Sequence, residues 1–470
     1  MLFNTPQFFW FFAIFFVLYN FVFTSHKKQL WLLLASSLVF YGAWNYAFIP
    51  LLVFSALSDY VIAGFVERNN HDPVTKKRWL MLSIFINLSV LGIFKYSNFV
   101  LQSTQDFIGL FGVDAHISTL SIILPVGISF YTFQSMSYTI DVYRGNMKAH
   151  RGFLTFLSAL SFFPQLVAGP ILRAQHILPQ LDNLPIPTMA NIRNGLMLIM
   201  LGLIKKTMAD MMAGPASSAF DATTPISSLD AWVGALAFSA QIYGDFSGYT
   251  DIAIGIALLM GFHIPINFNL PYFSSSPVDF WRRWHISLSS WLRDYLYISV
   301  GGNRNGNRTR NVFITMLLGG LWHGAAWTFV IWGAWHGFII SVTHWLTYSA
   351  IGRWVDARNN WLVRIFKVLV TFYLVVIGWV FFRATGFDNA WTMLTQMHMS
   401  TGVEASASSL VVLGLVVTGL VFMHLIDWLN IRFGSALNER SWLMWPILVI
   451  GFSLFLVVGD PGHDFIYFQF

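Results

Sequence analysis

Long apolar stretches with very few charges recur along nearly the whole chain, and they limit its possible folds more than any motif does. Charged residues make up 10% of the 470 residues and hydrophobic residues 56%, whereas a soluble domain carries about 25% charged residues. The chain therefore lacks the polar surface that a water-exposed globule needs. We predict an all-α polytopic membrane protein, which excludes a secreted disulfide scaffold, a disordered regulator and an ordinary cytosolic enzyme.

The apolar stretches are separated by short polar segments, as membrane helices are. A spanning helix needs about 20 apolar residues, so the longer stretches have room for two helices, and the shorter ones are expected to enter partway or lie at the interface. The sequence predicts roughly a dozen helices in a single transmembrane domain over residues 1–470, because no polar segment is long enough for another domain. The stretches lie near residues 7–23, 30–44, 47–65, 79–101, 118–140, 152–172, 194–204, 230–262, 311–345, 362–383, 408–427 and 443–459.

The net charge is +6, and ten of the 27 Lys and Arg residues stand in short clusters between these stretches. Lys and Arg gather in cytoplasmic loops of membrane proteins, so we interpret the clusters as signs of orientation and expect no nucleic-acid partner. The first stretch has no basic residue before it and is followed by two lysines, which predicts a retained span with an external N-terminus. The clusters are Lys27-Lys28, Lys76-Lys77-Arg78, Lys205-Lys206 and the loop from Arg304 to Arg310.

His323 stands in a long stretch without charged residues, between Gly320 and Gly324. An ionisable side chain at the membrane midplane costs about 2.5–3.5 kcal/mol on insertion scales, so its presence needs an explanation. A neutral imidazole can accept a proton near pH 7, although a structural histidine bonded to a neighbouring carbonyl is the common alternative. The flanking glycines permit a helix break or close backbone approach and favour a functional role.

A second polar segment begins at Ser276, where a capping box with Asp279 predicts the start of a helix. Asp279 and Arg283 have the favourable acid-before-base spacing of four residues. We expect His285 and Ser289 to share one face of the same helix. The tryptophans and arginines of this segment are also typical of an amphipathic helix at the membrane interface, an interpretation that does not require His285.

The spacing of the histidines suggests how they are arranged. His285 and His323 are 38 residues apart, enough to place them on neighbouring helices that face one cavity. His336 follows His323 by 13 residues, which on a straight helix turns it about 140° away and favours a structural or indirect role. The chain has no cysteine, and neither a third ligand nor an HExxH spacing accompanies the histidines. We therefore expect no metal and no thiolate chemistry.

A third polar cluster runs from Asp245 to Asp251, with Gly248 at its centre. Paired carboxylates are compatible with glycoside chemistry or with ion coupling. The glycine and the hydroxyl residues instead favour a helix break in which an aspartate caps the following helix, and we prefer that interpretation.

Five segments together resemble the membrane-bound O-acyltransferase family, in its bacterial polysaccharide branch typified by alginate O-acetyltransferase. The resemblance runs from end to end of the chain, and the fixed order of several long motifs makes it specific. The segments are residues 124–133, 245–249, 279–289, 319–324 and 465–470.

This resemblance implies helices that ring a central tunnel in the bacterial inner membrane. It implies an acyl donor, expected to be acetyl-CoA, that enters from the cytoplasm, and an exopolysaccharide acceptor, such as alginate or cellulose, on the outer side; no bound cofactor is expected. The essential histidine of the family corresponds to His323, and the second polar position corresponds to His285.

The expected chemistry is the removal of a proton from a sugar hydroxyl by His323, a step that contributes about 10²–10⁴-fold in rate. His285 would orient His323 or donate a hydrogen bond to the thioester carbonyl as charge develops there. We expect further residues to line the tunnel, namely Trp322, Trp284, Trp327, His336 and Asp245.

Two further matters stay open at this point. The acetyl group goes either to the polymer directly or first to a periplasmic partner protein of a secretion complex. The other classes of function are a transporter subunit, for which paired broken helices in two halves would be typical, and a non-catalytic scaffold, which has no use for a buried histidine.

Overall fold

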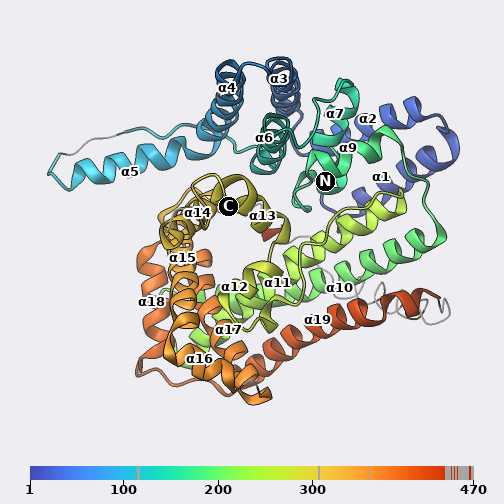
Figure 1. Ribbon diagram of the computed structural model, residues 1–470. Helices are drawn as coiled ribbons and strands as arrows, with labels where there is room; N and C mark the ends of the chain where they lie inside the picture. The colour runs from blue at the N-terminus through green and yellow to red at the C-terminus, as the bar shows by residue number, and fades with distance from the viewer. Residues whose placement is uncertain are drawn as a thin grey trace. The chain divides into compact units, whose positions relative to one another are not determined.

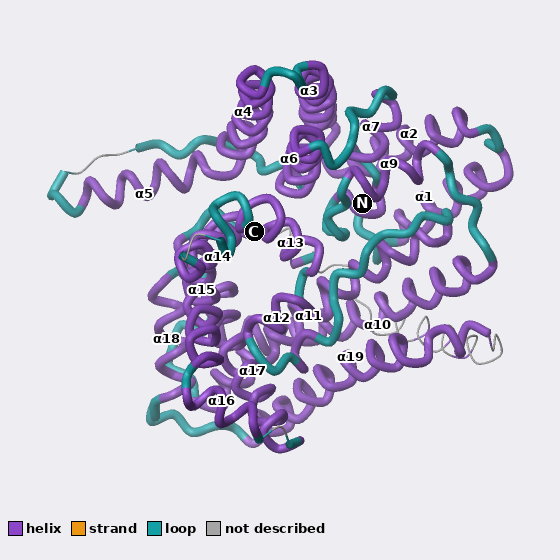
Figure 2. The backbone as a smooth tube through the Cα atoms, in the orientation of Figure 1, coloured by secondary structure: helices purple, strands orange, loops and turns teal. Residues whose placement is uncertain are grey.

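The computed structural model describes residues 1–113, 117–304, 307–358 and 360–439, and also residues 446, 449, 453, 465 and 466. Throughout these residues the regular structure is helical and no strand occurs, which confirms the predicted all-α class (Figure 1, Figure 2). Most of the apolar stretch predicted at 443–459 and the last four residues of the chain lie outside the described residues.

The chain forms two compact units, each with its own set of helices. Unit 1 comprises residues 1–195 and 253–265, and unit 2 comprises residues 196–252 and 266–470. The single transmembrane domain expected from the sequence stays a prediction.

Unit 1 contains α1 Pro6–Val17, α2 His26–Asn45, α3 Ile49–Arg68, α4 Pro73–Leu91, α5 Ser97–Gly109, α6 Ile128–Arg144, α7 Phe153–Leu160, α8 Phe163–Leu166 and α9 Ala174–Asp182. Two long helices contribute to both units, α10 Met189–Phe220 and α11 Ser228–Leu259. Unit 2 continues with α12 Pro277–Arg283, α13 Ile286–Trp291, α14 Arg308–His323, α15 Trp327–Tyr348, α16 Ala350–Ala357, α17 Trp361–Arg383, α18 Phe387–His398 and α19 Ala407–Glu439.

In unit 1, a buried carboxylate joins three helices. Asp59 on α3 accepts hydrogen bonds from Ser83 (2.5 Å) and Asn87 (2.7 Å) on α4, and from Ser135 (2.5 Å) and Thr139 (3.1 Å) on α6. A buried charge is tolerated only where such partners satisfy it. These four donors therefore fix α4 and α6 against α3.

In unit 2, helices α14 and α15 form a hairpin and lie side by side (Figure 1). Glycines make this contact possible: a Cβ atom on Gly320 would lie 2.2 Å from the carbonyl oxygen of Phe329, and one on Gly333 would lie 2.3 Å from that of Met316. The backbones thus approach closely, as small residues allow in membrane helix pairs. The hairpin fixes the end of α14, where His323 is the last helical residue.

Helices α10 and α11 also pack backbone to backbone within unit 2. A Cβ atom on Gly202 would lie 2.5 Å from the carbonyl oxygen of Gly248, and one on Gly248 would lie 2.7 Å from that of Gly202. The helix break predicted at Gly248 is therefore wrong, because α11 continues without interruption through residues 245–251. The glycine serves helix packing, a use that sequence spacing alone does not distinguish from a break.

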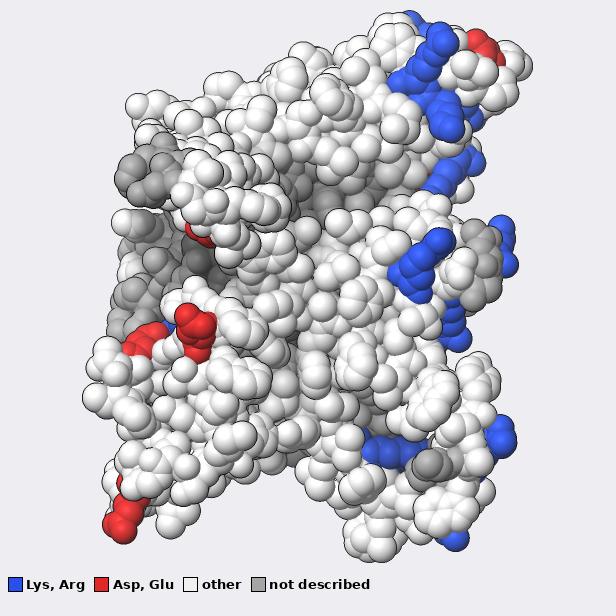
Figure 3. Space-filling view, turned by 90° about the vertical axis from the view of Figure 1, so that its left-hand side faces the viewer, with Lys and Arg blue, Asp and Glu red and all other residues white. Residues whose placement is uncertain are grey.

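Five helical runs among the described residues are long and apolar enough to cross a membrane, so the chain is a membrane protein. In unit 2, α17 is 23 residues long, or about 35 Å, against a hydrocarbon thickness of about 30 Å. Basic residues lie near both ends of it, Arg364 and Lys367 at the start and Arg383 as its last residue. Most side chains on the face drawn in Figure 3 are uncharged, as expected of helices that contact lipid.

Candidate active site

His323 ends α14 in a buried aromatic environment. Its side chain is 5% exposed, and its ring centroid lies 5.0 Å from Trp322, 5.0 Å from Trp332 and 5.3 Å from Phe382. The next residue, Gly324, has no room for a side chain, because a Cβ atom there would lie 2.0 Å from the Phe329 ring. The glycine that follows this histidine is therefore required by packing at the hairpin turn.

His285 lies in the short connection between α12 and α13 and is fully buried. The predicted helix start is confirmed: Ser276 caps α12 by accepting from the Asp279 amide at 3.1 Å, and Arg283 pairs with Asp279 at 3.0 Å. The continuous helix that we expected through Ser289 is wrong. His285 has a left-handed backbone (φ 44°, ψ 54°), which ends one helix and begins the next.

The structure brings the two predicted histidines together. The ring centroids of His285 and His323 are 6.2 Å apart with a 60° angle between the planes, and Trp322 lies 5.9 Å from His285. On the other side, Phe246 of α11 meets His285 edge to face at 4.7 Å. Three separate segments of unit 2 therefore build one site around two imidazoles. The catalytic roles of these residues stay predictions.

Asn267, which the sequence did not single out, holds the His285 connection. Its side-chain Oδ1 accepts from the backbone N–H of Ser287 (3.0 Å) and from the Ser287 hydroxyl (2.9 Å), and it lies 3.3 Å from His285 Nδ1. Its own carbonyl oxygen accepts from the Ile286 N–H at 2.9 Å. The signal available was an asparagine in a largely apolar segment, two residues before Asn269, and that pattern indicated nothing specific.

His336 takes a different position from the one its spacing predicted. The chain turns back at residues 324–326, so His323 and His336 lie on the two arms of a hairpin and not on one straight helix. Trp332 separates them, at 5.0 Å from the His323 ring and 4.8 Å from the His336 ring. Trp281 donates its indole N–H to His336 Nδ1 at 3.2 Å. His336 thus contacts Trp281 and also Trp332, which in turn packs against His323.

The tryptophans predicted to wall a tunnel differ in burial. Trp322 is 3% exposed and Trp284 is 1% exposed, whereas Trp327 is 58% exposed at the start of α15. Trp284 packs on Trp379, with ring centroids 4.9 Å apart. Burial therefore separates Trp327 from the other two, and the tunnel itself stays a prediction.

Asp245 belongs to a buried charge cluster at one side of the site. Lys205 is 1% exposed and pairs with Asp251 (2.6 Å) and Asp427 (2.8 Å). Lys206 is 5% exposed and pairs with Asp245 (2.8 Å) and with Asp210 (2.6 Å). The interpretation of Lys205-Lys206 as an orientation cluster in a loop is therefore wrong, because both lysines lie within α10 and bind carboxylates of α10, α11 and α19.

Two further contacts join this charge cluster to its surroundings. The Tyr243 hydroxyl donates to Asp427, and the backbone N–H of Ile466 donates to Asp245 at 2.6 Å. The Tyr243 ring stacks on His424, with centroids 4.2 Å apart. His424 is a buried histidine of α19 that sequence reasoning missed; the signal available was Asp427, three residues further along the same apolar stretch.

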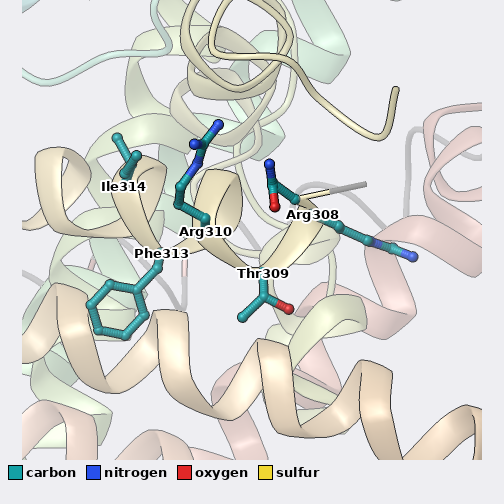
Figure 4. A pocket seen from close by; sticks show the side chains of 6 residues that line it. Arg308, Thr309, Arg310, Phe313 and Ile314 are labelled. Carbon is teal, nitrogen blue, oxygen red and sulfur yellow. The ribbon is translucent and has the colours of Figure 1, made fainter. Parts of the chain in front are cut away.

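A pocket opens at the start of α14, at the basic end of the hairpin. It has a volume of about 610 Å³, and Figure 4 shows Arg308 and Arg310 extending in different directions from the first turn. Arg308 also lies 2.7 Å from His344 Nε2 on α15. Arginines and a helix N-terminus both favour anions. The remaining lining residues are Asn307, Thr309, Phe313 and Ile314.

Metal ligation is a separate possibility for histidine and carboxylate side chains. Within the described residues, no three His, Asp or Glu side chains gather in a way that would hold a metal ion. The expectation that the site uses no metal stays a prediction.

Comparisons with known proteins point to one family. The family model for MBOAT, membrane-bound O-acyltransferase family, matches residues 148–387. The chain is 43% identical over 399 residues to a probable alginate O-acetylase AlgI of Pseudomonas aeruginosa, covering 84% of this chain and 75% of that one. It is 38% identical over 438 residues to a peptidoglycan O-acetyltransferase of Helicobacter pylori, covering 86% and 81%. A teichoic acid D-alanyltransferase of Bacillus subtilis is 27% identical over 282 residues, covering 56% and 70%.

Proposed function

The chain belongs to the membrane-bound O-acyltransferase family, and we propose that it acetylates hydroxyl groups of an exported polysaccharide. The relatives that support this proposal are named for the O-acetylation of alginate and of peptidoglycan. Both are polymers of hydroxyl-bearing sugars, and a hydroxyl is the acceptor that an O-acyltransferase requires. We propose an alginate-like polymer as acceptor, with cellulose and peptidoglycan as alternatives for the test to separate.

The observation that carries the proposal is the pair of buried histidines, His285 and His323, with ring centroids 6.2 Å apart. An imidazole among aromatic rings is neutral at little cost, so it can remove a proton from a hydroxyl. In the proposed step His323 takes that proton while the hydroxyl oxygen attacks the thioester carbonyl. The C–O bond forms, the C–S bond breaks, and the proton passes to the leaving thiolate.

We propose acetyl-CoA as the donor, with its phosphates at the pocket formed by Arg308 and Arg310. The first turn of α14 offers backbone N–H groups and positive charge to an anion. His323 closes the same helix fifteen residues further on, or about 22 Å along its axis. A straight helix between an anion pocket and a buried base suits a donor that carries its acyl group at the end of a long flexible arm.

Orientation follows from the same basic residues. Under the positive-inside preference, the end of unit 2 with Arg308, Arg310 and Arg364 faces the cytoplasm. We propose that the protein lies in the bacterial inner membrane, with its N-terminus on the periplasmic side because Lys27 and Lys28 follow the first apolar stretch. We also propose that a periplasmic partner of a secretion complex receives the acetyl group or presents the polymer.

The test uses purified protein in lipid nanodiscs with acetyl-labelled acetyl-CoA. Mannuronate oligosaccharides, cello-oligosaccharides and peptidoglycan fragments are added one at a time, and labelled ester is measured. We expect label in the mannuronate product with the wild type and about 10²–10⁴-fold slower labelling with His323→Ala. Label in another acceptor would change the substrate; equal labelling by His323→Ala would remove the catalytic role and favour a transporter or scaffold.

Arg308→Gln with Arg310→Gln tests the donor pocket separately. We expect the KM for acetyl-CoA to rise about tenfold or more, the effect of losing charge-assisted contacts of about 1.5 kcal/mol or more, with kcat little changed. An unchanged KM would contradict the placement of the donor.

A further inference from the structure

We propose that Asn267 is a positioning residue that holds His285 as its Nδ1–H tautomer and thereby makes His285 Nε2 a proton acceptor in the active site. The inference rests on the proposed function and assigns one of two roles to His285. It is carried by the hydrogen bonds that converge on one buried side-chain oxygen.

The identity of that oxygen is fixed by a backbone donor. The N–H of Ser287 points at the Asn267 side-chain atom from 3.0 Å, and an N–H cannot bond to the NH₂ end of an amide. The Ser287 hydroxyl approaches the same atom at 2.9 Å. The amide is therefore oriented with its oxygen towards this connection, as its network requires.

The tautomer of His285 follows from this orientation. An amide oxygen only accepts, so His285 Nδ1, at 3.3 Å, has to carry the hydrogen. In a neutral imidazole the other nitrogen, Nε2, then holds the lone pair. Asn267 thus fixes the tautomer of His285, as a hydrogen-bonded carboxylate or carbonyl does for many functional histidines.

The backbone supports the same assignment. His285 has a positive φ of 44°, a conformation that a side-chain-bearing residue adopts only where its surroundings hold it. Asn267 holds the two residues that follow His285, since its carbonyl binds the Ile286 N–H at 2.9 Å and its side chain binds Ser287. The residue is 1% exposed, so solvent does not replace these bonds.

The consequence concerns what His285 can do in the reaction. Of the two roles considered from sequence, the donation of a hydrogen bond to the thioester oxygen needs a hydrogen on Nε2, which this tautomer lacks. A lone pair at Nε2 instead accepts a hydrogen, either from His323 or from the acceptor hydroxyl. Nε2 of His285 is thus an acceptor in the site and not a donor.

The groups that face the His285 ring allow a clean pH test. Phe246 from α11 and Trp322 from α14 do not titrate, and His323 from α14 does. Asp245, next to Phe246, is paired with Lys206. A new carboxylate at position 267 would therefore be the one added charge that acts directly on His285.

Asn267→Asp provides that carboxylate in nearly the same shape. It stabilises the imidazolium form of His285, so the base is lost at a higher pH than in the wild type. We expect the acid limb of the acetyl-transfer pH profile to move up by about one pH unit or more, with acetyl-CoA and mannuronate oligosaccharides as substrates. Asn267→Ala should lower kcat about 100-fold, the effect of a misplaced catalytic group, and leave the KM for acetyl-CoA unchanged.

A merely structural asparagine would give a different result. Asn87 is the matched control, because it is 2% exposed and holds Asp59 and a helix carbonyl in unit 1. We expect Asn87→Ala to reduce the amount of folded protein while the acid limb stays where it is. If Asn267→Asp also leaves the acid limb unmoved, the positioning role is overturned.

A spectroscopic measurement covers variants that lack activity. Histidine-selective ¹⁵N spectra of the full chain in lipid bilayers distinguish protonated from lone-pair nitrogens, and the His285 signals are those lost in His285→Gln. We expect a protonated Nδ1 in the wild type and a mixture of tautomers in Asn267→Ala; a lone pair on Nδ1 of the wild type overturns the inference. Activity that survives His323→Ala would instead overturn the proposed function, so the two failures are distinct.

Discussion

Unit 2 contains two buried polar regions, the histidine site and the charge cluster around Lys205 and Lys206. They differ in how their polar groups are accommodated among apolar residues. The histidine site contains two imidazoles, which carry no charge in their neutral form, and Trp322, Trp332 and Phe382 surround His323. The charge cluster contains two ammonium groups and four carboxylates, paired at 2.6–2.8 Å. A neutral group avoids the cost of burying a charge, whereas a buried charge requires a partner of opposite sign. The first region is suited to move a proton, and the second to fasten helices.

The two regions are neighbours along one helix. Asp245 pairs with Lys206, and the next residue, Phe246, contacts the ring of His285. The charge cluster therefore fixes the helix whose aromatic side chain presses on the site. Variants in the histidine site should therefore change the rate of acetyl transfer, whereas variants in the charge cluster should change the stability of the fold.

The largest expected effect is that of His323→Ala. Loss of the proposed base should lower acetyl transfer by about 10²–10⁴-fold, while the protein still inserts and accumulates because an alanine is easily buried. The measurement is labelled ester per amount of purified protein. His398→Ala, at an exposed histidine of α18, is the control and should behave as the wild type. A comparable loss in both would show that the two histidine positions do not differ in function.

We expect Lys205→Met to lower the stability of the fold and not the rate of acetyl transfer. It leaves Asp251 and Asp427 without their shared cation, and breaking a buried pair costs about 3–5 kcal/mol. Thermal unfolding in detergent and the yield from membranes should both fall, while the rate per folded molecule stays near that of the wild type. Lys205→Met combined with Asp427→Asn should recover part of the stability. A lost rate in well-folded Lys205→Met protein would mean that the cluster takes part in the chemistry.

The smallest effect is expected for Trp281→Phe, which removes the indole donor to His336. A single neutral hydrogen bond contributes about 1 kcal/mol, so transfer should fall less than tenfold, chiefly in kcat. Trp391→Phe, at an exposed tryptophan of α18, is the control for aromatic substitution. A loss as large as that of His323→Ala would mean that His336 belongs to the proton-transfer site and is not only a supporting residue.

Local sequence signals predicted the features that depend on near neighbours. The apolar stretches gave the all-helical membrane class, and Ser276 and Asp279 gave the start of α12. The spacing of 38 residues between His285 and His323 allowed the two histidines to face one cavity, and the family resemblance singled out both, but their contact could not be derived from the sequence. The first two of these signals depend on residue type or on spacing within a few turns.

The errors share the opposite property. The partners of Lys205 and Lys206 on α11 and α19 are distant in sequence, so the lysines resembled an ordinary basic loop. Gly248 resembled a helix break because its partner Gly202 lies on another helix. Asn267 acts on residues 18 and 20 positions away, across a turn that no short spacing reveals. Contacts made through tertiary structure leave no periodic trace in the sequence.

The bond between Lys205 and Asp427 has a consequence for how the molecule is made. The two residues are 222 positions apart, so α10 enters the bilayer long before α19 has been synthesised. Until then Asp251, on the next long helix, is the carboxylate of this pairing that can accompany Lys205. We expect α10 and α11 to insert as a mutually neutralised pair, and the arrival of α19 to complete their attachment late in biogenesis.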